Sequence, residues 1–188
     1  DGSSTAFWEF TTAPSRWTVM APMGVARERS AVAAVNGRVY AIGGYPDRTS
    51  VEAYDPATDT WSSRAPKPTG VGSAGAGVID GIISVPGGSA VTGPVTAVEA
   101  YDPVTNTWST KAPLPSAVSG AAVAVVGGRL YVVGGSVPTT GAPLATCYVY
   151  NPGTNSWAAC ASMAVARGWP AVAVVGGQIY VAGGADLG

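Results

Sequence analysis

Residues 31–44 read AVAAVNGRVYAIGG, two apolar runs that are joined by Asn36-Gly37 and closed by Gly43-Gly44. Asn-Gly between two strand-like runs predicts a tight β-hairpin, because both residues tolerate the positive φ angles that a two-residue turn requires. The phrase returns as GVIDGIISVPGG (residues 77–88), AVAVVGGRLYVVGG (122–135) and AVAVVGGQIYVAGG (171–184). The chain is therefore built from copies of a hairpin that ends in a glycine pair.

A second landmark follows each of the first three hairpins. It is a tyrosine and a tryptophan seven residues apart, with Asp-Pro or Asn-Pro directly after the tyrosine: Tyr54 and Trp61, Tyr101 and Trp108, Tyr150 and Trp157. The glycine pairs end at positions 44, 88, 135 and 184, and the tryptophans at 17, 61, 108 and 157 are spaced by the same 44, 47 and 49 residues. Two independent landmarks with one period indicate an array of repeats.

Gly-Gly, Tyr and Trp at these offsets resemble the kelch repeat, which has about 50 residues and forms one four-stranded blade of a propeller. The resemblance covers nearly the whole chain and implies an all-β fold, a kelch-type β-propeller of four-stranded antiparallel sheets. The second repeat departs from the pattern, because Ser84 stands where the other hairpins carry tyrosine and Pro86 precedes its glycine pair.

The repeats divide residues 1–188 into a single kelch propeller unit with four blades' worth of strands. The expected parts are a half-blade at 6–20, blades at about 29–65, 73–112 and 120–161, and a half-blade at 169–184. The two half-blades have complementary strands, so we expect one blade to be split between the N- and C-termini.

Four blades are few for a closed ring, and an open arc would expose apolar flanks and strand edges. The sequence favours a homodimer in which two chains complete an eight-bladed ring. A closed four-bladed monomer and a fragment of a longer propeller are the alternatives.

The composition excludes several function classes. Charged residues make up 11% of the chain, the net charge is −1, and lysine and arginine form no run, so we expect no binding to nucleic acid or to anionic membranes. No apolar stretch approaches the roughly 20 residues of a membrane-spanning helix. The chain has no histidine, which removes most transition-metal sites and catalytic triads. We therefore expect no enzyme activity, no metal and no cofactor.

The two cysteines belong to the hairpin of Tyr150 and Trp157. If these aromatic residues face each other, Cys147 and Cys160 also face each other on adjacent antiparallel strands, within reach of a disulfide. A Cys147–Cys160 disulfide would favour an extracellular or periplasmic location, and two free thiols would favour the cytoplasm.

Candidate ligand-binding residues lie in the variable loops that lead into the first strand of each blade or connect its second and third strands. Peptide-binding kelch domains use arginines before the inner strand, so the resemblance implies that Arg27 and Arg167 line the central funnel, the opening around the propeller axis. Arg29 and Trp169 follow two residues later, and a guanidinium beside an indole suits a carboxylate or a sugar. Tyr45, directly after the first glycine pair, joins this set.

The sequence thus predicts a non-catalytic binding or interaction module whose ligand, a peptide or protein, is held at the loop face around the central funnel. A secreted carbohydrate-binding propeller is the first alternative. A structural or engineered propeller fragment that assembles into a larger ring without a specific ligand is the second.

Overall fold

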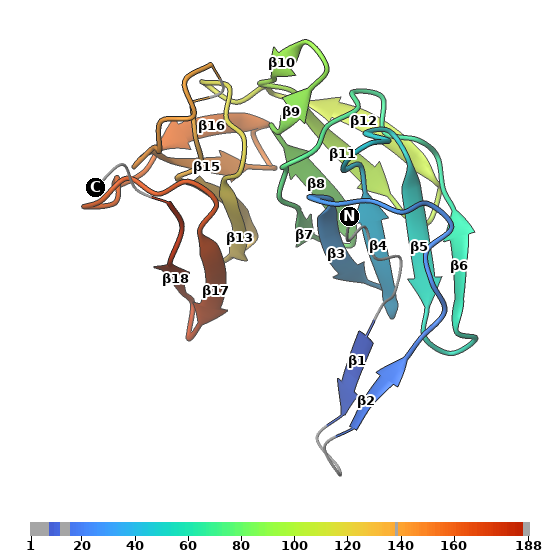
Figure 1. Ribbon diagram of the computed structural model, residues 1–188. Coiled ribbons are helices and arrows are strands. Elements are labelled where there is room, and N and C mark those ends of the chain that lie inside the picture. Colours follow the sequence, from blue (N-terminus) through green and yellow to red (C-terminus); the bar gives the residue numbers. More distant parts are fainter. Residues whose placement is uncertain (1–7, 12–15, 138, 186–188) are drawn as a thin grey trace.

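The computed structural model describes residues 8–11, 16–137 and 139–185, which form strands, turns and loops (Figure 1). Three four-stranded antiparallel sheets follow one another along the chain. The first blade comprises β3 (Ala31–Val35), β4 (Arg38–Ile42), β5 (Val51–Asp55) and β6 (Thr60–Ser63). The second comprises β7 (Gly77–Ile79), β8 (Ile82–Pro86), β11 (Val98–Asp102) and β12 (Thr107–Lys111). The third comprises β13 (Ala122–Val126), β14 (Arg129–Val133), β15 (Cys147–Asn151) and β16 (Ser156–Ala159). The expected all-β kelch propeller architecture is confirmed.

Two-stranded sheets complete the described chain. A hairpin of β1 (Trp8–Thr11) and β2 (Arg16–Val19) precedes the first blade, and a hairpin of β17 (Ala171–Val175) and β18 (Gln178–Ala182) follows the third. A small hairpin of β9 (Ser89–Ala90) and β10 (Gly93–Pro94) lies in a loop of the second blade. Among the described residues, none belongs to a helix long and apolar enough to cross a membrane.

The turn between the first two strands of each blade has the backbone that its sequence predicts. Asn36 and Gly37 have φ angles of 52° and 73°, and Asp80 and Gly81 have φ angles of 49° and 79°. Both residues of each pair are thus left-handed, as a turn that matches the twist of a β-hairpin requires.

The predicted cross-strand aromatic pairs are present in all three blades. Tyr54 is opposite Trp61, and the equivalent pairs are Tyr101 with Trp108 and Tyr150 with Trp157. Their ring centroids are 5.2, 5.1 and 5.1 Å apart. The tyrosines are buried, so these pairs fill the interior of the outer half of each blade.

The same tryptophans also join consecutive blades. Trp108 Nε1 in the second blade donates a hydrogen bond to the carbonyl of Ala65, where the chain leaves the first blade (2.9 Å). Oδ1 of Asn106 accepts from the N–H of the same Ala65 (2.9 Å) and from the hydroxyl of Tyr101 (2.7 Å). We call this pair of bonds on one alanine the junction clamp.

The junction clamp occurs at three successive junctions. Trp61 and Asp59 clamp Ala21, which follows β2, and Trp157 and Asn155 clamp Ala112, which follows β12. The inner strands β3, β7, β13 and β17 lie beside one another in that order. Blades therefore pack radially, with inner strands and outer clamps both fixing the angle between neighbours.

The described chain forms an open arc (Figure 1). Among the described residues, β18 pairs only with β17 and β1 pairs only with β2. The split blade that we expected the two termini to share is therefore not formed within one chain, and the alternative of a closed four-bladed monomer is wrong. The clamp on Ala21 holds the end of the N-terminal hairpin against the first blade, away from β18.

Candidate functional site

The loops before the inner strands form a repeated backbone structure at the centre of the arc. Arg29, Ser73, Gly120 and Trp169 occupy equivalent positions in four repeats and have φ angles of 53°, 54°, 62° and 52°. The N–H of each of the last three donates to the carbonyl of the preceding one, at 2.9, 2.7 and 2.9 Å. We call this chain of bonds the axial ladder. Left-handed backbone is uncommon for arginine, serine and tryptophan, and it persists here because each residue is held in the ladder.

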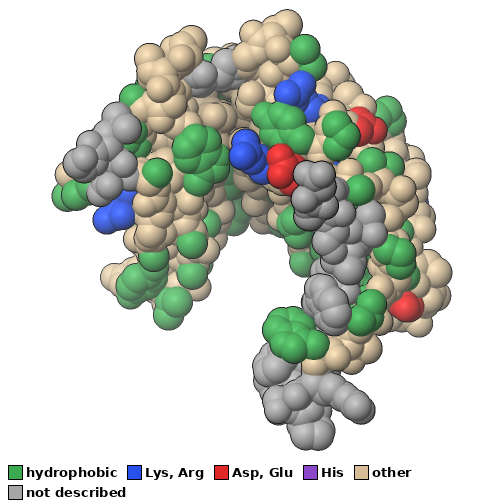
Figure 2. Space-filling view, in the orientation of Figure 1, with side chains coloured by type: hydrophobic (Ala, Val, Ile, Leu, Met, Phe, Trp, Pro, Cys, Tyr) green, Lys and Arg blue, Asp and Glu red, His purple; other side chains and the backbone are tan. Residues whose placement is uncertain are grey.

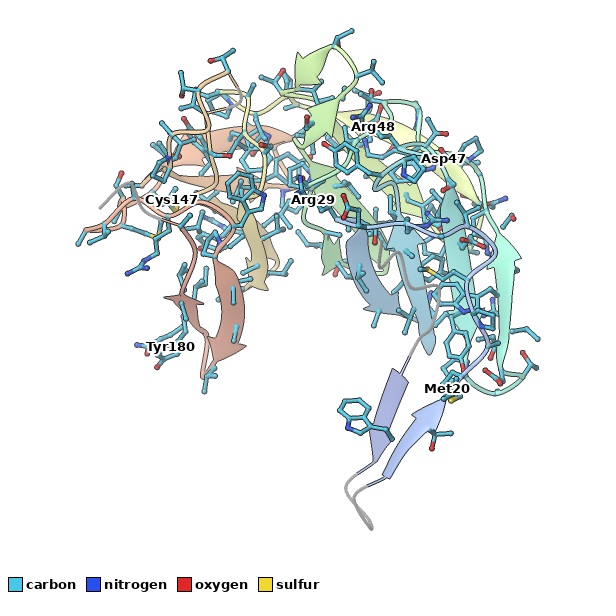
Figure 3. The ribbon with its side chains drawn as sticks, in the orientation of Figure 1. Met20, Arg29, Asp47, Arg48, Cys147 and Tyr180 are labelled. Carbon is cyan, nitrogen blue, oxygen red and sulfur yellow. A yellow bond between two sulfur atoms is a disulfide. The ribbon has the colours of Figure 1, made fainter. Side chains whose placement is uncertain are left out.

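The axial ladder borders a cavity of about 240 Å³. Each of the four repeats contributes two consecutive residues to its lining: Arg29, Ser30, Ser73, Ala74, Gly120, Ala121, Trp169 and Pro170. Figure 3 places Arg29 on the inner side of the arc. We call this cavity the axial site.

Two predicted ligand-binding residues meet in the axial site. The side chain of Arg29 is 60% exposed, with its Nε 3.9 Å from Glu28 Oε1, and Trp169 is 50% exposed. The indole lies over Gly120, where an added Cβ would be only 2.4 Å from Trp169 Nε1. Glycine at 120 therefore leaves the space that the indole occupies. The site offers one guanidinium, one aromatic face and the hydroxyls of two serines to a ligand.

Tyr45 lies beside the axial site and not in its lining. Its ring covers Gly72, where an added Cβ would be 2.2 Å from the ring, and the Arg48 guanidinium carbon is 4.4 Å from the ring centroid. A hydrogen bond with Ser89, with smaller contributions from Arg48 and Ser73, lowers the pKa of the Tyr45 phenol below its usual value. Tyr45 thus connects Ser73, in the axial site, with Arg48 in the β4–β5 loop.

That loop forms one wall of a second, larger groove of about 470 Å³. Its lining comes from the β4–β5 loop, the segment after β6 and the β9–β10 hairpin: Pro46, Asp47, Arg48, Thr49, Pro68, Thr69, Gly70, Ala90, Val91 and Thr92. Figure 3 shows Asp47 and Arg48 on this loop. Oδ1 of Asp47 accepts from Thr49 and Ser50, and these bonds lower the pKa of the carboxyl. Arg48 Nε is buried and has no hydrogen-bond partner among the described residues. Arg48 could not be predicted from the sequence, because nothing in the repeat pattern distinguishes it from other loop residues.

Arg27 does not line the funnel, and the structure corrects that expectation. Its side chain is fully buried and forms an ion pair with Glu52. Its Nη1 also donates to the carbonyls of Gly43 (3.3 Å) and Ser50 (2.9 Å). The guanidinium therefore binds both ends of the β4–β5 loop and is not accessible to a ligand.

Arg167, the equivalent residue before β17, donates through Nη1 to the Gly183 carbonyl at 2.8 Å, the same main-chain position that Arg27 contacts at Gly43. It is not part of the axial site lining. A lysine takes the buried-cation role in the second blade, where Lys67 pairs with Glu99. Burial is the main cause that lowers the pKa of Lys67, and the contacts with Glu99 oppose it.

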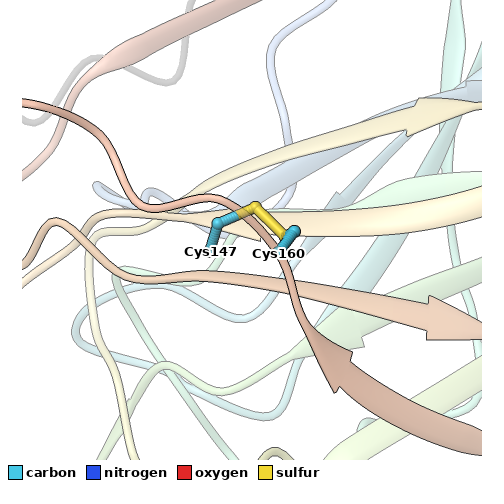
Figure 4. Close-up of a disulfide and its surroundings, with 2 residues drawn as sticks. All are labelled: Cys147 and Cys160. Atoms are coloured by element: carbon cyan, nitrogen blue, oxygen red, sulfur yellow. A yellow bond between two sulfur atoms is a disulfide. The ribbon is translucent and has the colours of Figure 1, made fainter.

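The two cysteines form the predicted disulfide (Figure 4). The Cys160 N–H donates to the Cys147 carbonyl at 2.9 Å, in line with the register of the β15–β16 pair. Residues 8–11, 16–137 and 139–185 contain no group of three His, Cys, Asp or Glu residues that could hold a metal ion.

Comparisons with known proteins agree with this architecture. A family model described as the KLHDC2/KLHL20/DRC7 Kelch-repeats domain matches residues 1–184. Kelch-like protein terF of Aspergillus terreus is 42% identical over 86 residues, which is 40% of this chain and 19% of that protein. Kelch-like protein 35 of Mus musculus is 35% identical over 89 residues, 46% of this chain and 16% of that protein. The matched segments thus span less than a fifth of the length of these relatives.

A solved structure of YjhT resembles the arc with a TM-score of 0.84 and 20% sequence identity. The match covers 97% of this chain and 67% of the YjhT chain. At this identity the likeness shows a shared fold.

Proposed function

The chain belongs to the kelch-repeat family, and from this premise we propose that it is a non-catalytic interaction module that binds a peptide or protein segment at the axial site. The kelch-like relatives support an interaction role in general. The observation that carries the proposal is the convergence of four repeats on one cavity, with an exposed guanidinium and an exposed indole in its lining. A rigid scaffold that presents variable loop residues around one opening is a common arrangement for binding.

Each group has a definite role in this proposal. Arg29 attracts a carboxylate of the ligand, because its side chain is 60% exposed and the contacts of its guanidinium in the described part of the chain, 3.9 Å from Glu28 Oε1 and 5.9 Å from the Tyr45 ring centroid, are both long. Trp169 supplies the apolar contact area, and the serine hydroxyls orient polar groups of the ligand.

The test is a binding screen with matched variants. A peptide library and a glycan array are probed with the wild-type protein and with the Arg29→Ala, Trp169→Ala and Arg129→Ala variants. Arg129 is exposed at a hairpin turn outside the axial site lining and is the control. We expect peptide ligands whose affinity falls at least tenfold in the first two variants and stays unchanged in the control. Peptide binding that is equal in all four proteins would refute the assignment.

Carbohydrate binding is the second candidate, because a half-exposed indole beside hydroxyl groups suits a sugar ring. Hits on the glycan array that depend on Trp169, without peptide hits, would favour it. Silence in both screens would favour a structural propeller fragment without a ligand of its own.

Location and assembly remain proposals with their own tests. The disulfide supports an extracellular or periplasmic location, and thiol titration of protein purified without reductant should find no free thiol. The eight-bladed homodimer stays a prediction, and its test is the mass in solution by light scattering.

A further inference from the structure

The second and third blades border a cavity of about 140 Å³ that is separate from the axial site. Both blades contribute to its lining: Ile79, Asp80, Ile82, Ser84 and Lys111 of the second, and Tyr150 and Pro152 of the third. Asp80 and Pro152 lie in hairpin turns and are exposed, whereas Ser84 is 6% exposed. The cavity therefore opens at the turns and extends inward to Ser84. We call it the inter-blade cavity.

Comparison of the repeats explains why a cavity lies here. Ser84 stands where the other three hairpins carry tyrosine. In the first blade, the ring of Tyr40 is buried against Tyr101 of the next blade, with ring centroids 5.9 Å apart and ring planes inclined by 58°. The equivalent of Tyr101 in the third blade is Tyr150, which is 3% exposed and lines the cavity. The inter-blade cavity thus occupies the place of one tyrosine ring, and the ring that would contact it is present.

The size and the apolar walls of this cavity suit an aromatic molecule. An apolar protein cavity of about 150 Å³ binds benzene, because the ring supplies contacts that the lining atoms otherwise lack. The inter-blade cavity has a similar volume, and its walls include Ile79, Ile82 and the ring of Tyr150. A bound ring beside Tyr150 would also gain from the tilted arrangement that aromatic pairs prefer.

The polar groups of the lining favour a neutral ring that carries a hydroxyl group. Within the described part of the chain, the Ser84 hydroxyl takes part in no hydrogen bond, and Asp80 and Lys111 belong to no ion pair. Asp80 and Lys111 contribute one charge of each sign, so the lining has no net charge. The face of the molecule in Figure 2 likewise carries only scattered charged side chains, which offer no attraction to a strongly charged ligand.

We propose that the inter-blade cavity binds a small phenol, whose ring takes the place of the absent tyrosine side chain. The ring packs against Tyr150 as Tyr40 packs against Tyr101. In the first blade, Tyr40 also interacts with Arg38, which is two residues nearer the hairpin turn. A phenol in the same orientation directs its hydroxyl towards the turn, where the Asp80 carboxylate accepts a hydrogen bond. The cavity shares no lining residue with the axial site, so this binding is independent of the proposed function.

The test is an NMR titration of the whole chain with phenol and with cyclohexanol, which has the same heavy atoms but no aromatic ring. Backbone amide shifts locate the bound molecule in the wild type. The Ser84→Tyr variant fills the cavity. The matched control is Ser63→Tyr, which adds the same side chain at an exposed position of β6.

We expect saturable shift changes centred on Ile82, Ser84 and Tyr150 in the wild type and in Ser63→Tyr. The affinity for phenol should fall at least tenfold in Ser84→Tyr, and cyclohexanol should bind the wild type at least fivefold more weakly than phenol does. Circular dichroism verifies the fold of each variant, and Ser84→Met, whose flexible side chain also enters the cavity, replaces Ser84→Tyr if that variant is misfolded.

Three results would each overturn the proposal. The first is the absence of saturable shift changes with phenol, or changes centred away from the inter-blade cavity. The second is equal affinity for phenol in the wild type and in the folded variant that fills the cavity. The third is equal affinity of the wild type for phenol and cyclohexanol, because the aromatic ring would then contribute nothing.

Discussion

A single carboxylate distinguishes the first junction clamp from the other two, with Asp59 where Asn106 and Asn155 stand. The bond from the Ala21 N–H and then the bond from the Tyr54 hydroxyl lower the pKa of Asp59. Because the folded pKa lies below the unfolded one, this group stabilises the fold above about pH 4 and loses that contribution as the pH falls through the folded pKa.

Asp59→Asn should therefore flatten the acid side of the stability profile. An amide oxygen accepts the same two bonds at Asn106 and Asn155, so we expect unchanged stability near pH 7 and a smaller loss than wild type near pH 3. Urea unfolding at both pH values measures the difference, with Asp80→Asn, in a hairpin turn outside the clamps, as the control. Identical profiles for wild type and Asp59→Asn would contradict the role of the carboxylate.

The buried ion pair of Arg27 and Glu52 yields a prediction about stability. Both side chains are almost inaccessible, and Glu52 also accepts from the main chain at Gly24 and Val25. Glu52→Ala leaves the guanidinium buried without its counter-charge, so we expect a loss of about 3–5 kcal/mol in the free energy of unfolding. Denaturant titration measures it, and the exposed Arg38–Asp55 pair is the control, since Arg38→Ala should change stability little. A loss as small as that of Arg38→Ala would show that the pair is dispensable.

The same ion pair explains why the prediction that Arg27 lines the central funnel was wrong. The kelch resemblance correctly put this arginine in the loop before the inner strand, but residue spacing does not say which way a long side chain turns. Glu52 and Glu99 held the missing signal, because a carboxylate inside an apolar strand needs a cation to be buried. Arg29 and Trp169 were predicted beside the central funnel, and both line the axial site. Each has a left-handed backbone in the axial ladder, which directs its side chain into the cavity.

At the scale of one blade, the departure at Ser84 has a structural consequence. Tyr40 packs against Tyr101 of the next blade, with ring centroids 5.9 Å apart. Ser84 is the equivalent of Tyr40, and a cavity of about 140 Å³ lies between it and Tyr150. The sequence identified the irregular position, and the structure shows that neighbouring side chains do not fill the missing volume.

Ser84→Tyr should fill this cavity. The new tyrosine should make with Tyr150 of the third blade the kind of contact that Tyr40 makes with Tyr101 of the second blade. We expect a gain of about 1 kcal/mol, which corresponds to a melting temperature about 2–4 °C higher. Thermal unfolding checks the gain, and Ser84→Ala should not produce it. A lower melting temperature for Ser84→Tyr would mean that the site is too small for the ring and the blade is overpacked.

The disulfide was predictable from the pairing of two strands alone. Once Tyr150 faces Trp157, the antiparallel register sets Cys147 against Cys160, and no knowledge of side-chain packing is needed. The bridge joins residues 13 apart in the sequence. In the chain-entropy picture, Cys147→Ala with Cys160→Ala should lower the free energy of unfolding by about 3 kcal/mol, measured by urea unfolding under non-reducing conditions. Reduction of the wild type should have a similar effect, and no change in either case would contradict the prediction.

For the whole molecule, the sequence predicted the blades but not the arrangement of the ends. Local signals specify each hairpin: the Asn-Gly turn, the alternation of the strands and the aromatic pair. Closure of a ring depends instead on the angle between neighbouring blades, which is the sum of many packing contacts that no motif records. The number of strands at the two ends predicted that β1–β2 and β17–β18 would form one four-stranded blade. Within one chain, however, these two hairpins are separate two-stranded sheets.

An open arc predicts a gradient of stability along the chain. Among residues 8–11, 16–137 and 139–185, the second blade has neighbours on both flanks, whereas β17–β18 has a neighbour on one flank and β18 pairs with β17 alone. In a repeat array each unit is stabilised by its own sheet and by its neighbours, so local opening should be easiest at the ends. We expect amides of β17 and β18 to exchange at least tenfold faster than those of β8 and β11, as measured by hydrogen–deuterium exchange with proteolysis. Tyr180→Ser should leave this gradient unchanged, because the Tyr180 side chain is 53% exposed and packs against no further blade in the described part of the chain. Tyr40→Ser should speed exchange in the first two blades, because Tyr40 is buried against Tyr101. Uniform protection from β3 to β18 in the monomer would mean that the ends are covered, and the open arc would then be wrong.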